Sequence, residues 1–303
     1  ALMKALESWT RSGLPENPTA WLFRVAQNDL MGVLRQRNKH RLLLEKNAIA
    51  KVETTERVPE CFLSGEMHDD LLRMLFVCCD EAIPTDSQLV FALKTLCGFN
   101  VREIAIRLFT TEPNVYKRLG RARSRMREQP TRIGELAPEQ YAARLPAVNK
   151  ILYLLFTEGY LSCQADFAIR AELCNEALRL AEILAEHPVG KTPETYALLA
   201  LMNLHTARMD ARLDSSGGLL LLEEQDRESW DGRRMQVGLK WLAKSAYGDT
   251  FSRFHAEAGI AAEHCLAPSF HETRWERVVE CYLLLEQAAP SPIHKLNRAV
   301  AVA

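Results

Sequence analysis

The chain has 303 residues, of which 48% are hydrophobic and 25% charged, and its formal net charge is -1 at pH 7. This composition supports one large core or two to three ordinary ones, and it excludes a disordered chain. The eight cysteines form no CxxC pair, and the apolar runs are too short to cross a bilayer, so we expect reduced thiols, no metal site, no membrane and a cytoplasmic location. The opening ALMKALESW lacks a basic segment followed by an apolar core, so we expect no signal peptide.

The first predicted helix is basic. Asn17 and Pro18 are typical of a helix start, and apolar residues then recur at three- and four-residue steps to about Arg37. Between Arg24 and Lys46 there are six lysines and arginines against two acidic residues. The polar stretch from about 38 to 68 is predicted to be a linker.

Two apolar-periodic helices follow, over 69–80 and 84–97, and a short turn joins them. Gly98 is expected to end the second helix, because glycine is favoured just after a helix. Asn100 and Glu103 have capping-box spacing, which predicts the start of a short helix. No alternating strand pattern of useful length occurs, so the predicted fold class is all-α.

The next segment, TTEPNVYKRLGRARSRMRE, holds six lysines and arginines against two glutamates. In a helix its apolar residues lie on one stripe and most of its cations on the opposite side. The stripe is Val115, Leu119, Ala122 and Met126, and the opposite side holds Lys117, Arg118, Arg121 and Arg125. A short helix, a tight turn and a second helix with a cationic outer face together predict a helix-turn-helix.

This arrangement predicts DNA binding. Lys117 and Arg121 are candidates for guanine edges, whereas Arg118, Arg123 and Arg125 are better placed for phosphates. A purely structural helix pair would explain the apolar stripes equally well. It would not explain why one outward face is so strongly cationic.

Two stretches resemble the extracytoplasmic-function (group 4) sigma factors of bacterial RNA polymerase. GFNVREIAIRLFTTEPNVYKRLGRARSRMRE is similar to their promoter-reading C-terminal helix-turn-helix, and PENPTAWLFRVAQNDLMGVLRQR is similar to the end of their domain two. The resemblance implies part of domain two over 1–40, a linker over 41–68 and domain four over 69–132. It also implies two partners, core RNA polymerase and promoter DNA, and no cofactor.

The same resemblance assigns the two DNA-contacting sets. The -35 duplex would be read by the helix from Asn114 to Arg125, and the melted -10 region would face the helix from Trp21 to Arg37. The -35 candidates are Asn114, Tyr116, Lys117, Arg118, Arg121, Arg123 and Arg125. The -10 candidates are Arg24, Gln27, Asn28, Arg35 and Arg37. A basic groove that holds separated bases offsets the cost of unstacking them.

Residues 133–303 resemble the long tetratricopeptide-like extension of one subgroup of these sigma factors. Helices expected near Pro193, Thr250 and Pro292 are unevenly spaced, which indicates irregular helical hairpins and no regular repeat. We expect this extension to dock on the sigma domains through an apolar run near Leu152, after a short tether over 137–145. Docking would regulate activity without any chemistry of its own.

No enzyme motif supports catalysis. The segment LEEQDRESWD gathers five carboxylates, but the arginines among and after them favour a salt-bridged connection over a metal or acid–base site. We therefore expect the protein not to be an enzyme. The alternative function is a helix-turn-helix regulator that acts without polymerase and carries a ligand-binding or partner-binding helical domain.

Overall fold

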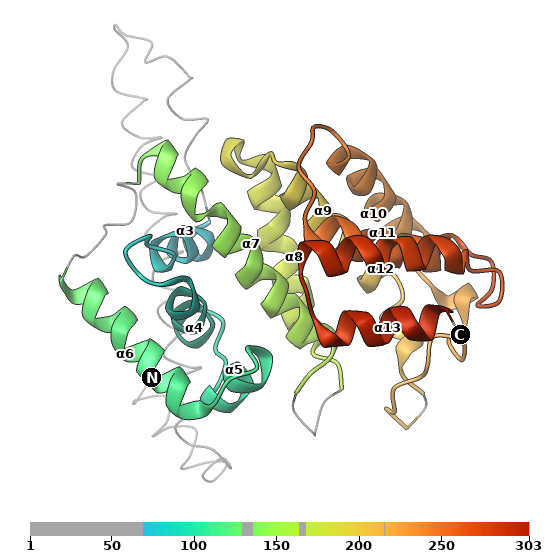
Figure 1. The fold of residues 1–303 in the computed structure, drawn as a ribbon, viewed down its shortest axis with the longest axis horizontal. Coiled ribbons are helices and arrows are strands. Elements are labelled where there is room, and N and C mark those ends of the chain that lie inside the picture. The colour runs from blue at the N-terminus through green and yellow to red at the C-terminus, as the bar shows by residue number, and fades with distance from the viewer. Residues whose placement is uncertain (1–68, 129–135, 164–167, 215, 303) are drawn as a thin grey trace, which may run out of the picture. The chain divides into compact units, whose positions relative to one another are not determined.

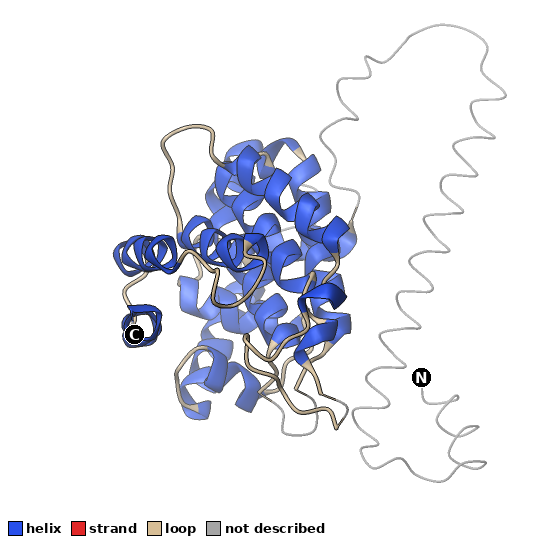
Figure 2. Cartoon of the chain, turned by 90° about the vertical axis from the view of Figure 1, so that its right-hand side faces the viewer, coloured by secondary structure: helices blue, strands red, loops and turns tan. Residues whose placement is uncertain are grey.

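The computed structural model describes residues 69–128, 136–163, 168–214 and 216–302, which all belong to one compact unit. Helices make up its regular structure, and the described residues contain no strand (Figure 2). The all-α prediction is confirmed for this part of the chain. The predicted domain bounds at 132 and 133 fall outside the described residues, as do the predicted domains 1–40 and 41–68, and all of these stay predictions.

Four helices form the first part of the unit. They are α3 (Asp70–Cys78), α4 (Thr85–Thr95), α5 (Val101–Arg107) and α6 (Glu112–Glu128). The Asp69 carboxylate caps α3 by accepting a hydrogen bond from the Leu72 amide at 2.9 Å. The predicted capping box of α5 is present, with reciprocal hydrogen bonds between Asn100 and Glu103. Gly98, after α4, has a φ of 76°, as expected for a residue that ends a helix.

The remaining helices are predominantly paired with their neighbours along the chain. They are α7 (Pro138–Tyr160), α8 (Ala171–Glu186), α9 (Pro193–Thr206), α10 (Gly232–Ser245), α11 (Arg253–Leu266), α12 (Trp275–Ala288) and α13 (Pro292–Val302), with short 3-10 turns η2 (Pro188–Gly190), η3 (Asp210–Arg212) and η4 (Arg227–Ser229). Helix α9 is apolar on nearly every side, so it is buried from Thr195 to Leu204 between α8, α10 and α11. No described helix is long and apolar enough to cross a membrane.

The tether predicted over 137–145 is wrong, because most of this segment is the first part of α7. Pro138 occupies the first turn, where a proline lacks only an N–H that would have no helical partner. The Ala137 amide donates a hydrogen bond to the Gln140 side chain at 2.9 Å, which closes the helix start. The described chain is therefore helical from Pro138 onward, where a tether was expected.

Helix α7 lies between the first four helices and the later ones (Figure 1). A single buried cluster runs from α3 through α7 to α11 and includes Val115 and Leu119 of α6. The Phe76 ring of α3 contacts the Tyr141 ring of α7 edge-on, with centroids 5.0 Å apart. The four N-terminal helices and the extension thus share one core.

The turn between α5 and α6 contains a strained residue. Phe109 has a φ of 48°, the left-handed region that favours glycine, and its side chain is 85% exposed. Two hydrogen bonds hold it there: the Thr110 amide donates to the Ala105 carbonyl at 2.9 Å, and the Phe109 amide donates to the Ile106 carbonyl at 3.2 Å. This pair of bonds ends α5 as a Schellman motif.

Phe109→Gly is expected to raise the free energy of unfolding by about 1 kcal/mol, because glycine adopts this conformation without the Cβ clash. Phe109→Ala is the control, since alanine removes the exposed ring but keeps the Cβ atom. Urea unfolding of the three proteins would separate the two effects. Equal stability of the glycine and alanine variants would show that the backbone is not strained here.

Candidate nucleic-acid interface

Helix α6 rests on α4 and α5 through its predicted apolar stripe. Val115, Leu119 and Ala122 are buried, and Met126 is half-buried near the end of the helix. This packing fixes the rotation of α6 about its axis. The opposite face must then point away from the core.

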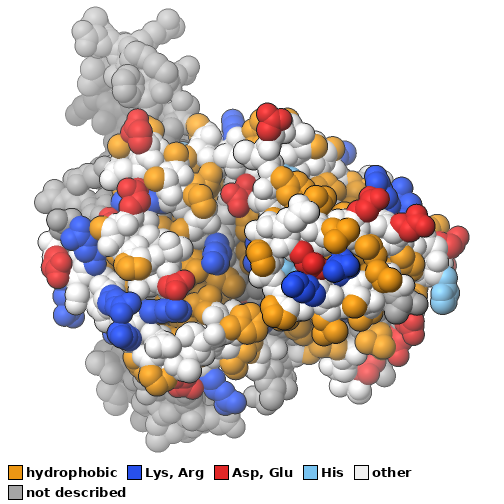
Figure 3. All heavy atoms as spheres, viewed as in Figure 1, with side chains coloured by type: hydrophobic (Ala, Val, Ile, Leu, Met, Phe, Trp, Pro, Cys, Tyr) orange, Lys and Arg blue, Asp and Glu red, His pale blue; other side chains and the backbone are white. Residues whose placement is uncertain are grey.

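The outer face of α6 is polar and cationic. Among the predicted -35 residues, Asn114, Tyr116, Lys117, Arg121 and Arg123 are exposed. No ion pair holds Lys117, Arg121 or Arg123 within the described part of the chain. Figure 3 shows several lysine and arginine side chains on this side of the molecule, with a few acidic side chains among them. The face therefore offers uncompensated positive charge to a polyanion.

Two other predicted -35 residues are already engaged. Arg118 donates to the Asp86 carboxylate of α4 at 2.8 Å, and Arg125 lies 3.9 Å from Glu128. Both arginines are half-buried. An arginine that must leave a carboxylate to reach DNA contributes less to affinity than one that is free, so Arg118 and Arg125 are weaker phosphate candidates than Arg123.

The predicted -10 residues lie outside the described residues. These are Arg24, Gln27, Asn28, Arg35 and Arg37, together with the rest of the segment 21–37 that the sequence predicts to be helical. Their placement relative to α6 stays a prediction.

The far side of α5 is fastened to the end of α7 by charged side chains. Arg107 donates to Glu158 at 2.6 Å and also to the Leu161 carbonyl. Arg170, which precedes α8, lies 3.2 Å from Glu103 and 3.9 Å from Glu158. Glu158 is fully buried, so its charge depends on these partners.

Two more contacts hold α3 against the extension. The buried Arg144 of α7 donates to the Phe76 carbonyl at 3.2 Å and to Asp80 at 3.1 Å. Arg179 of α8 donates to Asp69 at 2.7 Å. The helix-turn-helix is therefore positioned by the extension through its back, while the outer face of α6 stays open in the described part.

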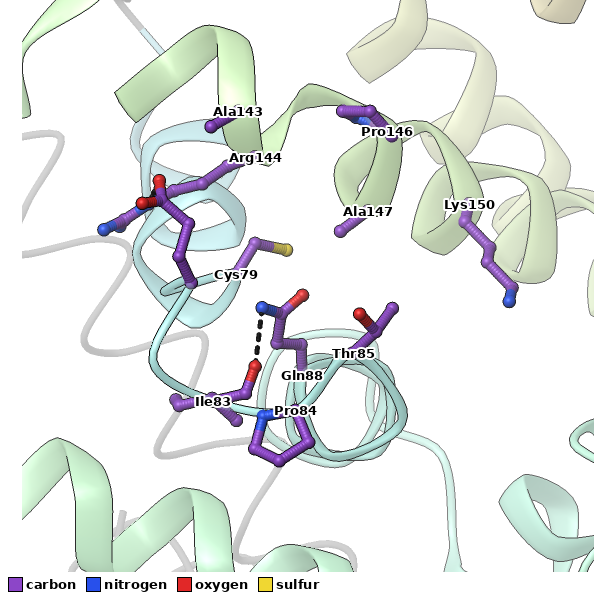
Figure 4. A pocket seen from close by; sticks show the side chains of 11 residues that line it. Cys79, Ile83, Pro84, Thr85, Gln88, Ala143, Arg144, Pro146, Ala147 and Lys150 are labelled. Atoms are coloured by element: carbon purple, nitrogen blue, oxygen red, sulfur yellow. Dashed lines mark hydrogen bonds and ion pairs between the residues drawn. The ribbon is translucent and has the colours of Figure 1, made fainter. Parts of the chain in front are cut away.

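A pocket of about 400 Å³ lies where the α3–α4 turn meets α7 (Figure 4). Gln88 closes part of it by donating to the Ile83 carbonyl at 2.9 Å, and Pro146 and Ala147 of α7 form the opposite wall. Cys79 also lines the pocket, but burial raises the pKa of its thiol and keeps it protonated. This pocket offers packing and no reactive group.

The acidic segment 222–231 is salt-bridged at one point within the described residues, where Arg234 lies 3.9 Å from Asp231. Asp226 and Asp231 cap η4 and α10 by accepting backbone amide hydrogen bonds. Arg227 donates to the carbonyls of His264 and Ala267, at 2.6 and 2.8 Å, and not to a carboxylate. The two aspartates of this segment thus serve mainly as caps of the helices that follow them.

Phe109 and Asp86 belong to this interface but were missed from the sequence. Phe109 projects from the turn that precedes α6, and Asp86 tethers Arg118. A phenylalanine where a turn needs positive φ leaves no sequence signal, since glycine is the residue that marks such positions. Asp86 lies 32 residues from Arg118, and the chain has many other acidic residues, so the sequence does not single out this pair.

Two comparisons with known proteins gave a match, one for part of the extension and one for the whole chain. Residues 144–246 match a family of unknown function, DUF6596, which covers most of α7 through α10. The uncharacterised protein R00370 of Rhizobium meliloti (strain 1021) is 34% identical over all 303 residues of this chain and 71% of its own length. No solved structure matches the chain. The identity over its full length shows that the chain belongs to the same protein family as R00370 of Rhizobium meliloti.

Proposed function

We propose that the protein is a promoter-specificity factor of RNA polymerase, of the extracytoplasmic-function sigma type that its sequence resembles. The observation that carries the proposal is the outer face of α6, where Lys117, Arg121 and Arg123 are exposed and unpaired within the described residues. Helix α6 follows a capped short helix and a tight turn. An α-helix of this kind fits the major groove of B-DNA.

The cations on α6 suit two kinds of contact. Lys117 and Arg121 are four residues apart, so they share one side of the helix and can reach neighbouring base pairs. An arginine fork matches the O6 and N7 acceptors of guanine, which gives sequence preference. Arg123 is exposed at a different angle on the helix and suits a phosphate.

The extension serves as a built-in support for the DNA-reading helices. It holds α5 through Glu158 and α3 through Arg144. Because these contacts lie behind the helix-turn-helix, the extension can set the orientation of α6 without covering it. A change in the extension would then alter promoter binding or polymerase engagement.

Run-off transcription with the full-length protein and core polymerase tests the function. Templates would carry the upstream regions of the host genome, and the proposal expects transcripts from a defined subset only. Sequence-specific footprints without any transcript would favour the alternative, a regulator that acts without polymerase. Absence of both would contradict DNA reading altogether.

Substitutions in α6 should separate base reading from phosphate binding. Arg121→Ala is expected to cost about 1–3 kcal/mol of binding free energy at one base pair of the -35 element and to relax specificity there. Arg123→Ala should weaken all duplexes alike and reduce the salt slope of log affinity by about one unit. Arg277→Ala, on an exposed side of α12, is the matched control.

The measurement is duplex affinity at several salt concentrations, for a promoter sequence and a scrambled one. Equal affinities of the Arg121→Ala and Arg123→Ala variants and the wild type would exclude α6 as the reading helix.

A further inference from the structure

A second pocket lies inside the extension, away from α6. Its volume is about 310 Å³, and its lining comes from α7, α9, α11, α12 and α13, together with Arg208 and Leu222 in the segments after α9. The size is at the lower end of the range for sites that hold small molecules. The proposed function assigns no role to this pocket.

Two histidines on the pocket lining have unused ring nitrogens. The Nδ1 atoms of His205 and His264 are buried and have no hydrogen-bond partner among the described residues. Burial lowers the pKa of His264 to about 4, with Arg208 and Arg227 adding to the effect, and burial also lowers the pKa of His205. Both rings are therefore neutral near pH 7. A buried polar atom without a partner is unfavourable, and a bound group that reaches it would remove this cost.

The pocket also carries positive charge without a matching carboxylate. Arg208 lines it and donates from Nε to the Tyr160 hydroxyl at 3.0 Å, but no ion pair engages its guanidinium within the described chain. Arg212 and Arg227 lie nearby and bind carbonyl oxygens and aromatic rings. Glu257 is the only carboxylate on the lining, and Arg253 already neutralises it at 2.6 Å.

The rest of the lining combines apolar walls with neutral polar groups. Ile260 of α11, Leu285 of α12 and Ile293 of α13 supply aliphatic surface. Tyr282 and Asn297 supply neutral donors and acceptors on the same side. A fully hydrated inorganic ion would leave the aliphatic walls without a partner, whereas an apolar molecule without charge would leave Arg208 and the two histidines unsatisfied.

We propose that this pocket binds a small organic carboxylate, with its charged end at Arg208 and the two histidines and its apolar body against Ile260 and Leu285. The carboxylate accepts hydrogen bonds from the guanidinium and from the unused imidazole nitrogens. The apolar body is displaced from water into the aliphatic part of the pocket. Nothing in this binding requires DNA or polymerase, so it stands apart from the proposed function.

Isothermal titration of the full-length protein tests the proposal with benzoate and hexanoate as probes. Their neutral counterparts, benzamide and hexanamide, have nearly the same shape without the charge. At least one carboxylate should bind at one site, and its amide should bind at least about tenfold more weakly because a charge-assisted hydrogen bond is lost. Phenyl phosphate distinguishes a phosphate site, and tighter binding of it than of both carboxylates would overturn the carboxylate assignment.

Variants locate the site. Arg208→Gln should raise the dissociation constant of the carboxylate by at least about tenfold, and Arg277→Gln on the exposed side of α12 should leave it unchanged. Asn297→Asp, at an exposed position of α13, adds a negative charge to the pocket rim without removing a core side chain, and should also weaken binding. Binding of neither carboxylate, equal binding of acid and amide, or unchanged binding in both pocket variants would overturn the proposal.

Discussion

Glu158→Ala is expected to lower the free energy of unfolding by about 3–5 kcal/mol, because it leaves the charge of Arg107 without its buried partner. Glu158 is 0% exposed and accepts hydrogen bonds from Arg107, from the Ser162 hydroxyl and from the Cys163 amide. Removing it also leaves those donors unsatisfied. The measurement is urea unfolding at neutral pH.

The same carboxylate should make the stability depend on pH. Burial alone would raise the pKa of Glu158, but the hydrogen bonds from Arg107 and Cys163 outweigh it, so the pKa lies below its ordinary value of 4.5. A depressed carboxyl pKa contributes stability that is fully present above the unfolded pKa and is lost as the pH falls through the folded one. Wild-type stability should therefore fall more steeply than that of the variant once the pH drops below about 4.5.

Glu172→Ala is the matched control, since Glu172 also lies next to Arg170 but is exposed. Exposed ion pairs contribute about 0–1 kcal/mol, so this change should be nearly neutral. A Glu158→Ala protein with wild-type stability would mean that the contact between α5 and α7 is held by apolar packing alone.

Local signals in the sequence were sufficient for the start of α5 and for the buried face of α6. The Asn100–Glu103 capping box involves residues three apart, and the stripe through Val115 and Leu119 follows from helix geometry alone. Both depend on interactions within one or two turns. The structure confirms both, and with them the cationic side of α6.

Interactions between distant residues were not predictable. Arg107 and Glu158 are 51 residues apart, and Arg118 and Asp86 are 32 apart. Many carboxylates in the sequence could pair with each arginine. The packing of α5 and α6 on the core determines which carboxylate lies close enough to do so. The pocket that contains His205, Arg208 and His264 was not predictable for the same reason, because its lining residues come from segments far apart in the sequence.

The misassigned tether has a different cause. The tether expected over 137–145 contains Pro138, and proline occurs in the first turn of helices as well as in connecting segments. Helicity from 138 onward brings Tyr141 and Arg144 onto the face of α7 that meets α3. The first part of α7 therefore packs against α3.

Truncation after Glu135 is accordingly expected to destabilise helices α3 to α6 strongly. It removes α7, and with it Tyr141 from the Phe76 ring and Arg144 from the Phe76 carbonyl and Asp80. Leu72 and Phe76 are fully buried in the intact chain, and exposing a side chain of this type costs about 1.5–3 kcal/mol. The loss is comparable with the whole stability of a small domain.

The fragment should therefore unfold at a much lower urea concentration, without a sharp transition, and should lose promoter affinity. Truncation after Ala289 is the control, because it removes α13, which packs on α12, and keeps α7 and α8 in place. That protein should retain the wild-type affinity for promoter duplex. If the extension were freely tethered, no core residue of α3 would depend on α7. Both truncated proteins would then bind DNA and unfold like the intact chain. Duplex binding and urea unfolding of the two truncated proteins decide between these models. Only a shared core makes the removal of α7 weaken the proposed binding of promoter duplex.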